Sequence, residues 1–220
     1  MIKKDAFGDK KIHVPFFQPY ITDNDKASVQ KALGATLLTD GPMLQNFENL
    51  FSTFTRSKFG VGVSNATSAL HLSLKSLGIG KGDEVIVPDM TFVATANSVL
   101  LSGATPVLAD IDDDMNISVE SIEKSLTKKT KAILPVHFAG KACDIKKIKK
   151  IADSHNLALI EDCAHAIGAR LNDRHVGTFG DVGCFSFYPT KNITTLEGGM
   201  IITQSRKIAE YVRSLRNHGI

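Results

Sequence analysis

A carboxylate and a histidine follow the apolar run 157–160, in the segment Glu161-Asp162-Cys163-Ala164-His165. The run predicts a buried strand, and a carboxylate at the end of a buried strand stays ionised only beside a cation. A protonated pyridine nitrogen would be one such cation. A structural ion pair or a helix cap are the alternative uses of Asp162. His165 could pack on a ring or hydrogen-bond to its oxygen, although a single histidine here is equally typical of a protein core.

A single lysine, Lys191, follows the predicted strand 183–188 and is preceded by Tyr188, Pro189 and Thr190. This is an unusual setting for a solvated surface charge. A partly desolvated lysine loses its proton more easily and becomes a nucleophile for a carbonyl carbon. Ser186 lies five residues earlier and could point to the same place. Considered alone, Lys191 could still be a surface lysine.

A small polar turn, 64–68, separates the predicted strand 60–63 from the predicted helix 68–77. The N-terminus of a helix presents free backbone N–H groups and the positive end of the helix dipole, which together favour an anion. Thr67 and Ser68 could therefore hold a phosphate. The alternative is that Ser64 or Asn65 simply caps the helix.

Together these segments place an acid, a lysine and a phosphate-binding turn after three predicted strands. Ligands of parallel α/β sheets gather at the carboxyl ends of the strands. This set, in this order, is the one that a pyridoxal 5'-phosphate site requires. Cys163 and His165 could also be considered as metal ligands, but no second pair closes a site, so no metal is predicted.

The elements that must position these residues alternate along the chain. Several apolar runs lack a polar alternation, which is typical of strands covered on both faces. Seven strands are predicted at 60–63, 84–88, 106–110, 131–136, 158–161, 183–188 and 199–203. Helices are predicted at 23–38, 43–55, 68–77, 94–101, 117–126 and 145–155, after an irregular start. The fold class is α/β, a three-layer sandwich around a mostly parallel seven-stranded sheet. The gap 189–198 is too short for a crossover helix, so the last strand is expected to be antiparallel.

The composition argues against several classes of protein. The chain has 220 residues, of which 43% are hydrophobic and 22% are charged, with a formal net charge of +3. These values are typical of a globular protein and argue against a nucleic-acid-binding surface. No apolar run approaches the roughly 20 residues of a membrane helix, and the N-terminus lacks the apolar stretch of a signal peptide. Three cysteines suit reduced thiols, so a cytoplasmic location is expected.

Five segments resemble the DegT/StrS-type nucleotide-sugar aminotransferases, from about Pro15 to the last residue. They are GVGVSNATSALHLSLKSLGIGKGDEVIVPDMTFVATANSV, GATPVLADID, KAILPVHFAGKACDI, LIEDCAHAIGA and GTFGDVGCFSFYPTKNITTLEGGMIIT. The FSFYPTKN and EDCAHA motifs are highly specific in this order and spacing. The resemblance implies the large domain of the aspartate aminotransferase (type I) fold.

The resemblance also implies roles for individual residues. Lys191 matches the lysine that binds pyridoxal phosphate covalently and then moves protons, and Asp162 matches the acid that pairs with the pyridinium nitrogen. His165 lies over the ring or near its oxygen. The remaining matches are Thr67, Ser68 and Ser186 at the phosphate and Phe92 stacked on the ring.

The implied reaction is the transfer of an amino group to a nucleotide-linked keto-sugar from an amino acid, usually glutamate, in the biosynthesis of amino sugars for a glycan or an antibiotic. The resemblance further implies a homodimer. It divides the chain into an N-terminal arm, 1–35, and a large domain, 36–220. Relatives continue well beyond this point, so we expect their small C-terminal domain to be absent and residues 216–220 to lie in a loop after the last strand. The alternative is a truncated fragment that binds cofactor or dimerises without turnover, in a regulatory or partner-binding role.

Overall fold

The computed structural model describes residues 3–5, 8–12, 14–15 and 17–220. One sheet of seven strands forms its centre, in the order β3-β11-β10-β7-β6-β4-β5. The strands are β3 (Phe59–Val63), β4 (Glu84–Pro88), β5 (Thr105–Ala109), β6 (Thr130–Ile133), β7 (Ala158–Asp162), β10 (Val182–Ser186) and β11 (Gly199–Thr203). All seven predicted strands are present, with ends that differ by a few residues.

Strand β11 is antiparallel to both of its neighbours, β10 and β3, whereas the other neighbouring pairs are parallel. The connection from β10 to β11 contains no helix, which confirms the predicted antiparallel return. The carboxyl ends of the other six strands therefore lie along one edge of the sheet. This edge is where the sequence placed its reactive residues.

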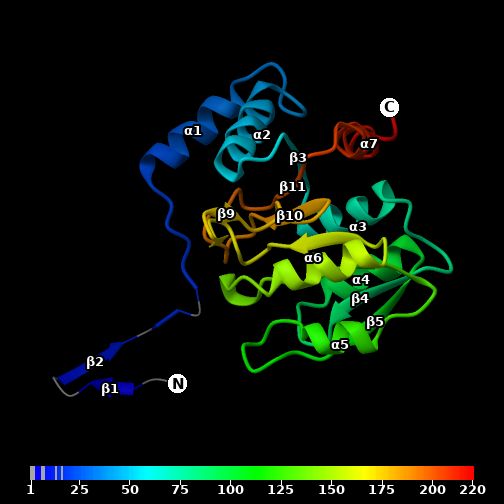
Figure 1. Cartoon of the computed structure of the whole chain (residues 1–220). Helices are drawn as coiled ribbons and strands as arrows, with labels where there is room; N and C mark the ends of the chain where they lie inside the picture. The colour runs from blue at the N-terminus through cyan, green and yellow to red at the C-terminus, as the bar shows by residue number, and fades with distance from the viewer. Residues whose placement is uncertain (1–2, 6–7, 13, 16) are drawn as a thin grey trace.

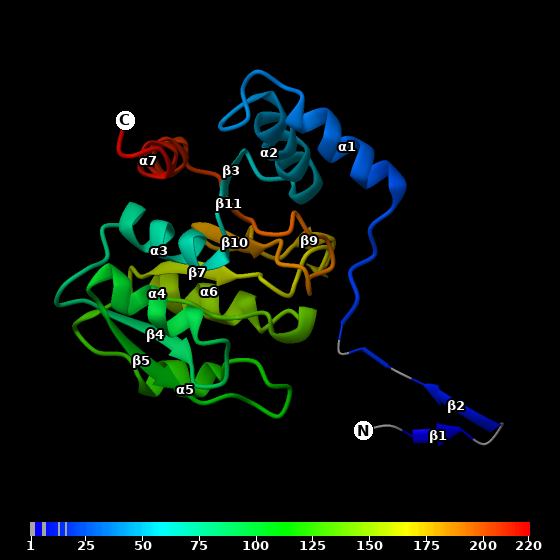
Figure 2. The same cartoon turned by 180° about the vertical axis from the view of Figure 1, so that it is seen from behind.

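Helices cover both faces of the sheet (Figures 1 and 2). On one face α3 (Ala66–Ser76), α4 (Ala94–Ser102) and α7 (Arg206–Arg216) share a core that includes Leu70, Val99 and Val212. On the other face lie α5 (Val119–Lys124), α6 (Ile145–Ser154) and α2 (Pro42–Thr55). The three-layer α/β prediction is confirmed.

Helix α6 illustrates how the sequence pattern produces this layering. Ile145, Ile148 and Ile151 recur at helical spacing and are buried against the sheet, while Lys146 and Lys150 face solvent. Burial of three isoleucines stabilises the fold by roughly 2 kcal/mol for each side chain. Lys146 and Lys150 thus lie on the outer side of a surface helix.

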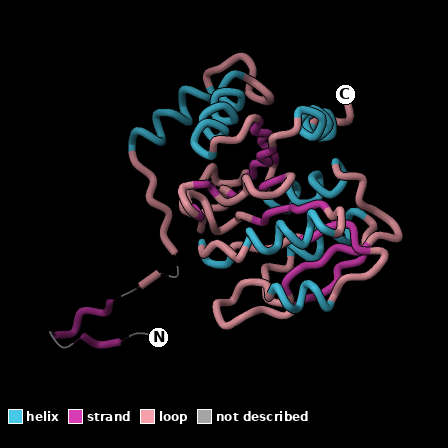
Figure 3. The backbone as a smooth tube through the Cα atoms, in the orientation of Figure 1, coloured by secondary structure: helices cyan, strands magenta, loops and turns pink. Residues whose placement is uncertain are grey.

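Four features differ from the expectations. Helix α1 (Asp23–Leu33) ends before residue 38, because the chain leaves the helix at Gly34. The start of the chain is not wholly irregular, since β1 (Lys3–Asp5) and β2 (Gly8–Ile12) pair as antiparallel strands away from the sheet (Figure 3). A hairpin of β8 (Arg170–Leu171) and β9 (Arg174–His175) was not predicted. The short 3-10 turn η1 (Phe138–Gly140) was also missed.

The expectation for the end of the chain was also incomplete. Residues 217–220 are turn and loop as expected, but helix α7, which lies between β11 and these residues and includes Arg216, was not predicted. The Ser205 side chain caps this helix by accepting from the N–H of Ile208. Ile208, Ala209 and Val212 are then buried against the sheet, which is the physical reason for the helix. Within the described ranges, none of the helices is long and apolar enough to cross a membrane.

Candidate active site

A cavity of about 680 Å³ opens at the carboxyl edge of the sheet. Its walls come from the ends of β4, β7 and β10, the first turn of α3 and the loop after β10. Six of the seven residues predicted from the sequence line it: Thr67, Phe92, Asp162, His165, Ser186 and Lys191. Ser68 is not among the lining residues.

Asp162 ends β7 and its side chain is buried. Its Oδ1 accepts from the N–H of Ala164 at 3.0 Å, and its Oδ2 accepts from the hydroxyl of Thr95, also at 3.0 Å. Burial raises the pKa of this carboxyl, although both hydrogen bonds act to lower it. In the described part of the chain no lysine or arginine lies within ion-pair distance of Asp162. The site therefore holds a buried acid that lacks a cationic partner and would be stabilised by one.

Lys191 follows β10 in a turn in which its N–H donates to the carbonyl of Tyr188 at 2.9 Å. Its side chain is partly buried. Burial lowers the pKa of Lys191, and the charge on Asp162 acts in the opposite direction. A larger share of the amine is therefore in the nucleophilic, unprotonated form than for a solvated lysine.

His165 and Phe92 bring two rings to the cavity. The His165 ring lies edge-on to Phe138, with 6.2 Å between the ring centroids. Burial lowers the pKa of His165 and the nearby Lys191 charge lowers it further, so that the imidazole is neutral near pH 7. Phe92 is 72% exposed. An aromatic face this open is free to cover a flat ligand.

The turn that the sequence predicts to bind a phosphate is the first turn of α3. Asn65 caps this helix, since its Oδ1 accepts from the N–H of Ser68 at 2.8 Å, as the alternative for this segment predicted. The Ser68 hydroxyl contacts that of Ser64 at 3.0 Å. The N–H groups of Ala66 and Thr67 have no partner inside the helix, as in any first turn. Thr67 faces the cavity, whereas Ser68 completes the cap.

A glycine allows this turn to approach the sheet. A Cβ on Gly199 would lie 2.5 Å from the carbonyl carbon and oxygen of Asn65 and 2.9 Å from the nitrogen of Ala66. No side chain fits such a gap, so the first turn of α3 packs directly on the start of β11. Only glycine, which has no Cβ, permits so close a backbone approach.

A buried polar cluster of Glu161, His137 and Cys163 lies next to the site on β7 and the end of β6. It is the group of potential metal ligands found in the described residues, with its ligand atoms within 4.8 Å of one another. Glu161 already accepts from three backbone N–H groups and contacts His137. Burial raises the pKa of Cys163 to about 12, so its thiol is protonated and unreactive. These contacts indicate a structural role for the cluster.

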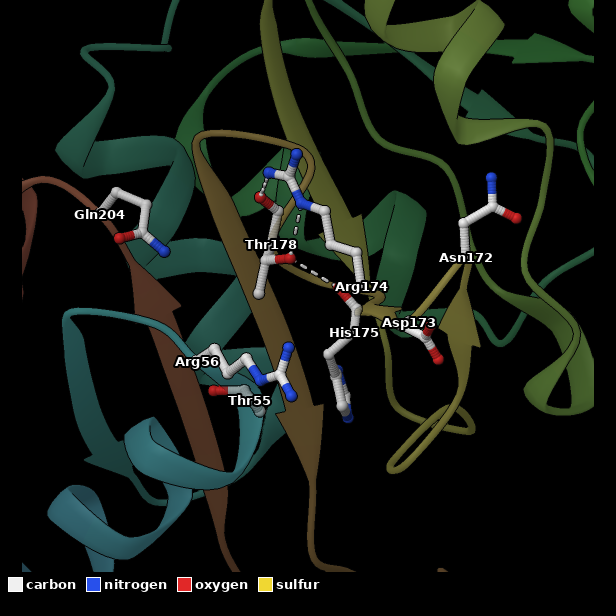
Figure 4. Close-up of a pocket in the computed structure, with 8 residues that line it drawn as sticks. All are labelled: Thr55, Arg56, Asn172, Asp173, Arg174, His175, Thr178 and Gln204. Carbon is white, nitrogen blue, oxygen red and sulfur yellow. Dashed lines mark hydrogen bonds between the residues drawn. The ribbon is translucent and has the colours of Figure 1, made fainter.

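A second, smaller cavity of about 380 Å³ lies among the end of α2, the β8–β9 hairpin and the end of β11 (Figure 4). It contains Arg56 and Arg174, but Arg174 already donates to Thr178 and covers the ring of Phe179 at 4.4 Å. None of the predicted site residues lines this cavity. The chemistry of the molecule is therefore assigned to the first cavity.

The sequence analysis did not predict several residues that lie at the first cavity. Thr91 and Thr95 stand one helical turn apart at the entrance of α4, and Thr95 contacts Asp162 although 67 residues separate them. A Thr-x-x-x-Thr spacing after a strand was the available signal. Phe138, Tyr188 and Glu197 also line the wall. Their positions depend on loops whose shapes the sequence pattern does not predict.

Comparisons with known proteins agree with this geometry. A family model described as the DegT/DnrJ/EryC1/StrS aminotransferase family matches residues 19–220. The chain belongs to this family. It is thereby homologous to sugar aminotransferases, and the resemblance of the sequence motifs is confirmed.

Individual relatives support the assignment. The GDP-perosamine synthase of Escherichia coli O157:H7 is 42% identical over 210 residues, which cover 94% of this chain and 58% of that protein. The X-ray structure of the aminotransferase from Psychrobacter cryohalolentis matches with a TM-score of 0.90 and 40% identity, covering 93% of this chain and 53% of that one. NtdA from Bacillus subtilis, solved with bound cofactor PMP, matches with a TM-score of 0.81 and 36% identity, covering 88% and 45%. The chain thus spans about half the length of these relatives.

The residues present fit pyridoxal phosphate. The buried, unpaired Asp162 calls for a cation such as a pyridinium nitrogen, and Lys191 offers an amine with a lowered pKa. The first turn of α3 offers backbone N–H groups for a phosphate. All three features face a single cavity.

Proposed function

We propose that this chain carries the cofactor site of a pyridoxal-phosphate-dependent aminotransferase that acts on a nucleotide-linked keto-sugar. The observation that carries the proposal is the meeting of Asp162, Lys191 and the first turn of α3 in one cavity at the carboxyl edge of the sheet. Family membership supports the reaction class, and the similarity to a GDP-perosamine synthase supports the substrate class.

Each side chain has a proposed part in the reaction. Asp162 keeps a proton on the ring nitrogen, and the amine of Lys191 takes the proton from the α-carbon of the donor and delivers it onward. Thr67 and Ser186, which line the cavity, hold the phosphate together with backbone N–H groups of the first turn of α3, whereas Ser68 completes the helix cap. When bound, pyridoxal phosphate supplies an electron sink for the carbanion that forms at the donor's α-carbon.

The rings of Phe92 and His165 are proposed to pack against the cofactor. Phe92 would cover one face of the ring, and the neutral imidazole of His165 would lie over it or donate to its oxygen. A neutral histidine adds no second positive charge beside Lys191. The positive charges of the site would then be those of Lys191 and the ring nitrogen.

The overall transfer is balanced between two substrates. The donor, glutamate in our proposal, gives up its amino group and leaves as a 2-keto acid. The carbonyl carbon of the keto-sugar receives that amino group and becomes an amino carbon. The product would serve the biosynthesis of an amino sugar for a surface polysaccharide.

We further propose a homodimer in the cytoplasm, with residues 1–35 as an arm and 36–220 as the large domain. Exposed apolar side chains at the carboxyl end of α4 and on β5 support an assembly of copies: Leu100, Leu101 and Leu108 are each more than half exposed. Three free, buried cysteines support a reducing compartment.

The test is an absorbance titration of the purified chain with pyridoxal phosphate. We expect a yellow band that sodium borohydride abolishes in the wild type and that Lys191→Ala lacks. Lys146→Ala, on the exposed side of α6, is the matched control and should retain the band. A folded wild-type protein with no band, or a band that survives in Lys191→Ala, would contradict the proposal.

A further inference from the structure

Two threonine hydroxyls form a hydrogen-bonded chain that ends on the acid of the site. The Oγ1 atoms of Thr91 and Thr95 lie 2.8 Å apart, and Thr95 Oγ1 lies 3.0 Å from Asp162 Oδ2. Thr95 is fully buried, whereas Thr91 is partly exposed and lines the cavity. This series of hydrogen bonds thus leads from the cavity wall into the protein and ends on the carboxylate of Asp162.

Because the carboxylate of Asp162 is ionised, it determines which atom donates in each of these two hydrogen bonds. A carboxylate only accepts, so the single hydroxyl proton of Thr95 points to Asp162. The Thr95 oxygen must then accept from Thr91, which donates its own proton inward. The available protons and acceptors therefore determine the direction of both hydrogen bonds: Thr91 donates to Thr95, and Thr95 donates to Asp162.

Other buried hydroxyls on α4 behave differently. Ser98 donates to the carbonyl of Thr95 at 2.8 Å, and Ser102 donates to the carbonyl of Val99 at 2.7 Å. Such bonds to the helix's own backbone are the ordinary outcome for a hydroxyl inside a helix. The Thr95 hydroxyl instead reaches from α4 to β7, which connects two elements across the site.

The second carboxylate oxygen is held from the other side. Asp162 Oδ1 accepts from the N–H of Ala164, in the loop that leads to His165. With a donor on each oxygen, the plane of the carboxylate cannot rotate without breaking a bond. A hydrogen bond to a charged group contributes more than one between neutral groups.

We propose that Thr95, oriented by Thr91, is a positioning residue that holds the Asp162 carboxylate ionised and aligned for the ring nitrogen of the cofactor. This inference rests on the proposed function and adds to it a residue to which the resemblance gave no role. Thr95 does not touch the cofactor; it acts through Asp162.

The experiment compares Thr95→Val, which keeps the shape and removes the hydroxyl, with Thr95→Ser, which keeps the hydroxyl. Pyridoxal phosphate labelled with ¹⁵N at the ring is bound to each protein, and its NMR shift reports whether the ring nitrogen is protonated. We expect Thr95→Val to shift the signal toward the unprotonated form and to weaken cofactor binding by about tenfold. Thr95→Ser should restore both values.

Ser98→Ala is the matched control, because it removes a buried hydroxyl from the same helix that does not reach Asp162. It should leave the ¹⁵N shift unchanged. If Thr95→Val fails to fold, Thr95→Ala is measured against Ser98→Ala in the same way. An unchanged shift and affinity in a folded Thr95 variant overturns the inference. A wild type that binds no cofactor contradicts the proposed function instead, so the two failures are distinct.

Discussion

The imidazole Nε2 of His137 lies 3.0 Å from Oε2 of Glu161, and both side chains are completely buried. The Nδ1 atom of His137 accepts from the N–H of Cys143, so the proton of the ring is on Nε2 and points to Glu161. The pair joins the end of β6 to β7. Glu161 directly precedes Asp162, and this pair therefore lies immediately beneath the candidate site.

Glu161 also fixes the loop that leads into β10. Its two carboxylate oxygens accept from the N–H groups of Gly177, Phe179 and Gly180, each at 2.7 Å. Strand β10 ends at Ser186, shortly before Lys191. One buried carboxylate on the strand that carries the acid thus holds the loop that leads into the strand preceding the lysine.

The first prediction concerns Glu161→Gln. The amide has one acceptor oxygen in place of two, so at least one buried N–H loses its partner. We expect the free energy of unfolding to fall by about 3 kcal/mol, measured by urea denaturation. Glu123→Gln, on the exposed side of α5, is the control and should change it by less than about 0.5 kcal/mol. Equal midpoints for the two variants would refute the structural role of Glu161.

The second prediction concerns Asp162→Asn without cofactor. Because burial raises the pKa of this carboxyl, the folded state binds the proton more tightly than the unfolded state. Wild-type stability from this group is therefore present below the ordinary pKa of about 3.9 and is lost as pH rises through the folded value. Asparagine carries no charge, so the cofactor-free variant should be at least as stable as wild type at pH 7.

The measurement is a series of denaturation curves between pH 4 and pH 8. The stability difference in favour of Asp162→Asn should grow as pH rises and then level off. The same variant should lose the cofactor band, because the ring nitrogen has lost its anion. A variant that is less stable at pH 7 than at pH 4, relative to wild type, would show that the carboxylate is not strained by burial.

The third prediction concerns the reactivity of Lys191. Burial lowers the pKa of its amine, so acylation of Lys191 should reach its half-maximal rate below the ordinary lysine value of about 10.4. Labelling across a pH series, with quantification of the peptide by mass spectrometry, gives this midpoint. The Asp162 charge opposes the effect of burial, so Asp162→Asn should lower the midpoint further. A midpoint that rises in that variant would mean that the two groups do not interact as described.

The fourth prediction concerns Gly199→Ala. The added methyl group would lie 2.5 Å from backbone atoms of Asn65, so the first turn of α3 must move away from β11. We expect a loss of about 2 kcal/mol in stability and weaker binding of pyridoxal phosphate, because the turn proposed to bind the phosphate is displaced. Gly34→Ala is the matched control, since its Cβ would meet only the carbonyl oxygens of Lys31 and Gln30, at an ordinary 3.5 and 3.8 Å. Full cofactor affinity in a folded Gly199→Ala protein would show that the packing of Gly199 against Asn65 does not contribute to cofactor binding.

The hydrophobic pattern was sufficient to predict the strands, most of the helices and the residues at the strand ends. Uninterrupted apolar runs require burial on both faces, and this requirement is local enough to be seen in β4 and β11 without a structure. The antiparallel return of β11 followed from the length of one connection. Asp162 and Lys191 were found for the same reason, because each polar residue directly follows a run that must be buried.

Which side chains contact one another depends on the packing of elements that are far apart in the sequence. The fold brings the first turn of α4 to the carboxyl end of β7, so Thr95 contacts a carboxylate 67 residues away, a pairing that no periodicity encodes. Ser68 and Thr67 are neighbours in sequence, yet one completes the helix cap and the other faces the cavity, because a helix turns about 100° per residue. Local burial requirements determine where helices and strands form. The packing of distant elements determines which side chains contact one another, and the contact of Asp162 with Thr95 depends on that packing.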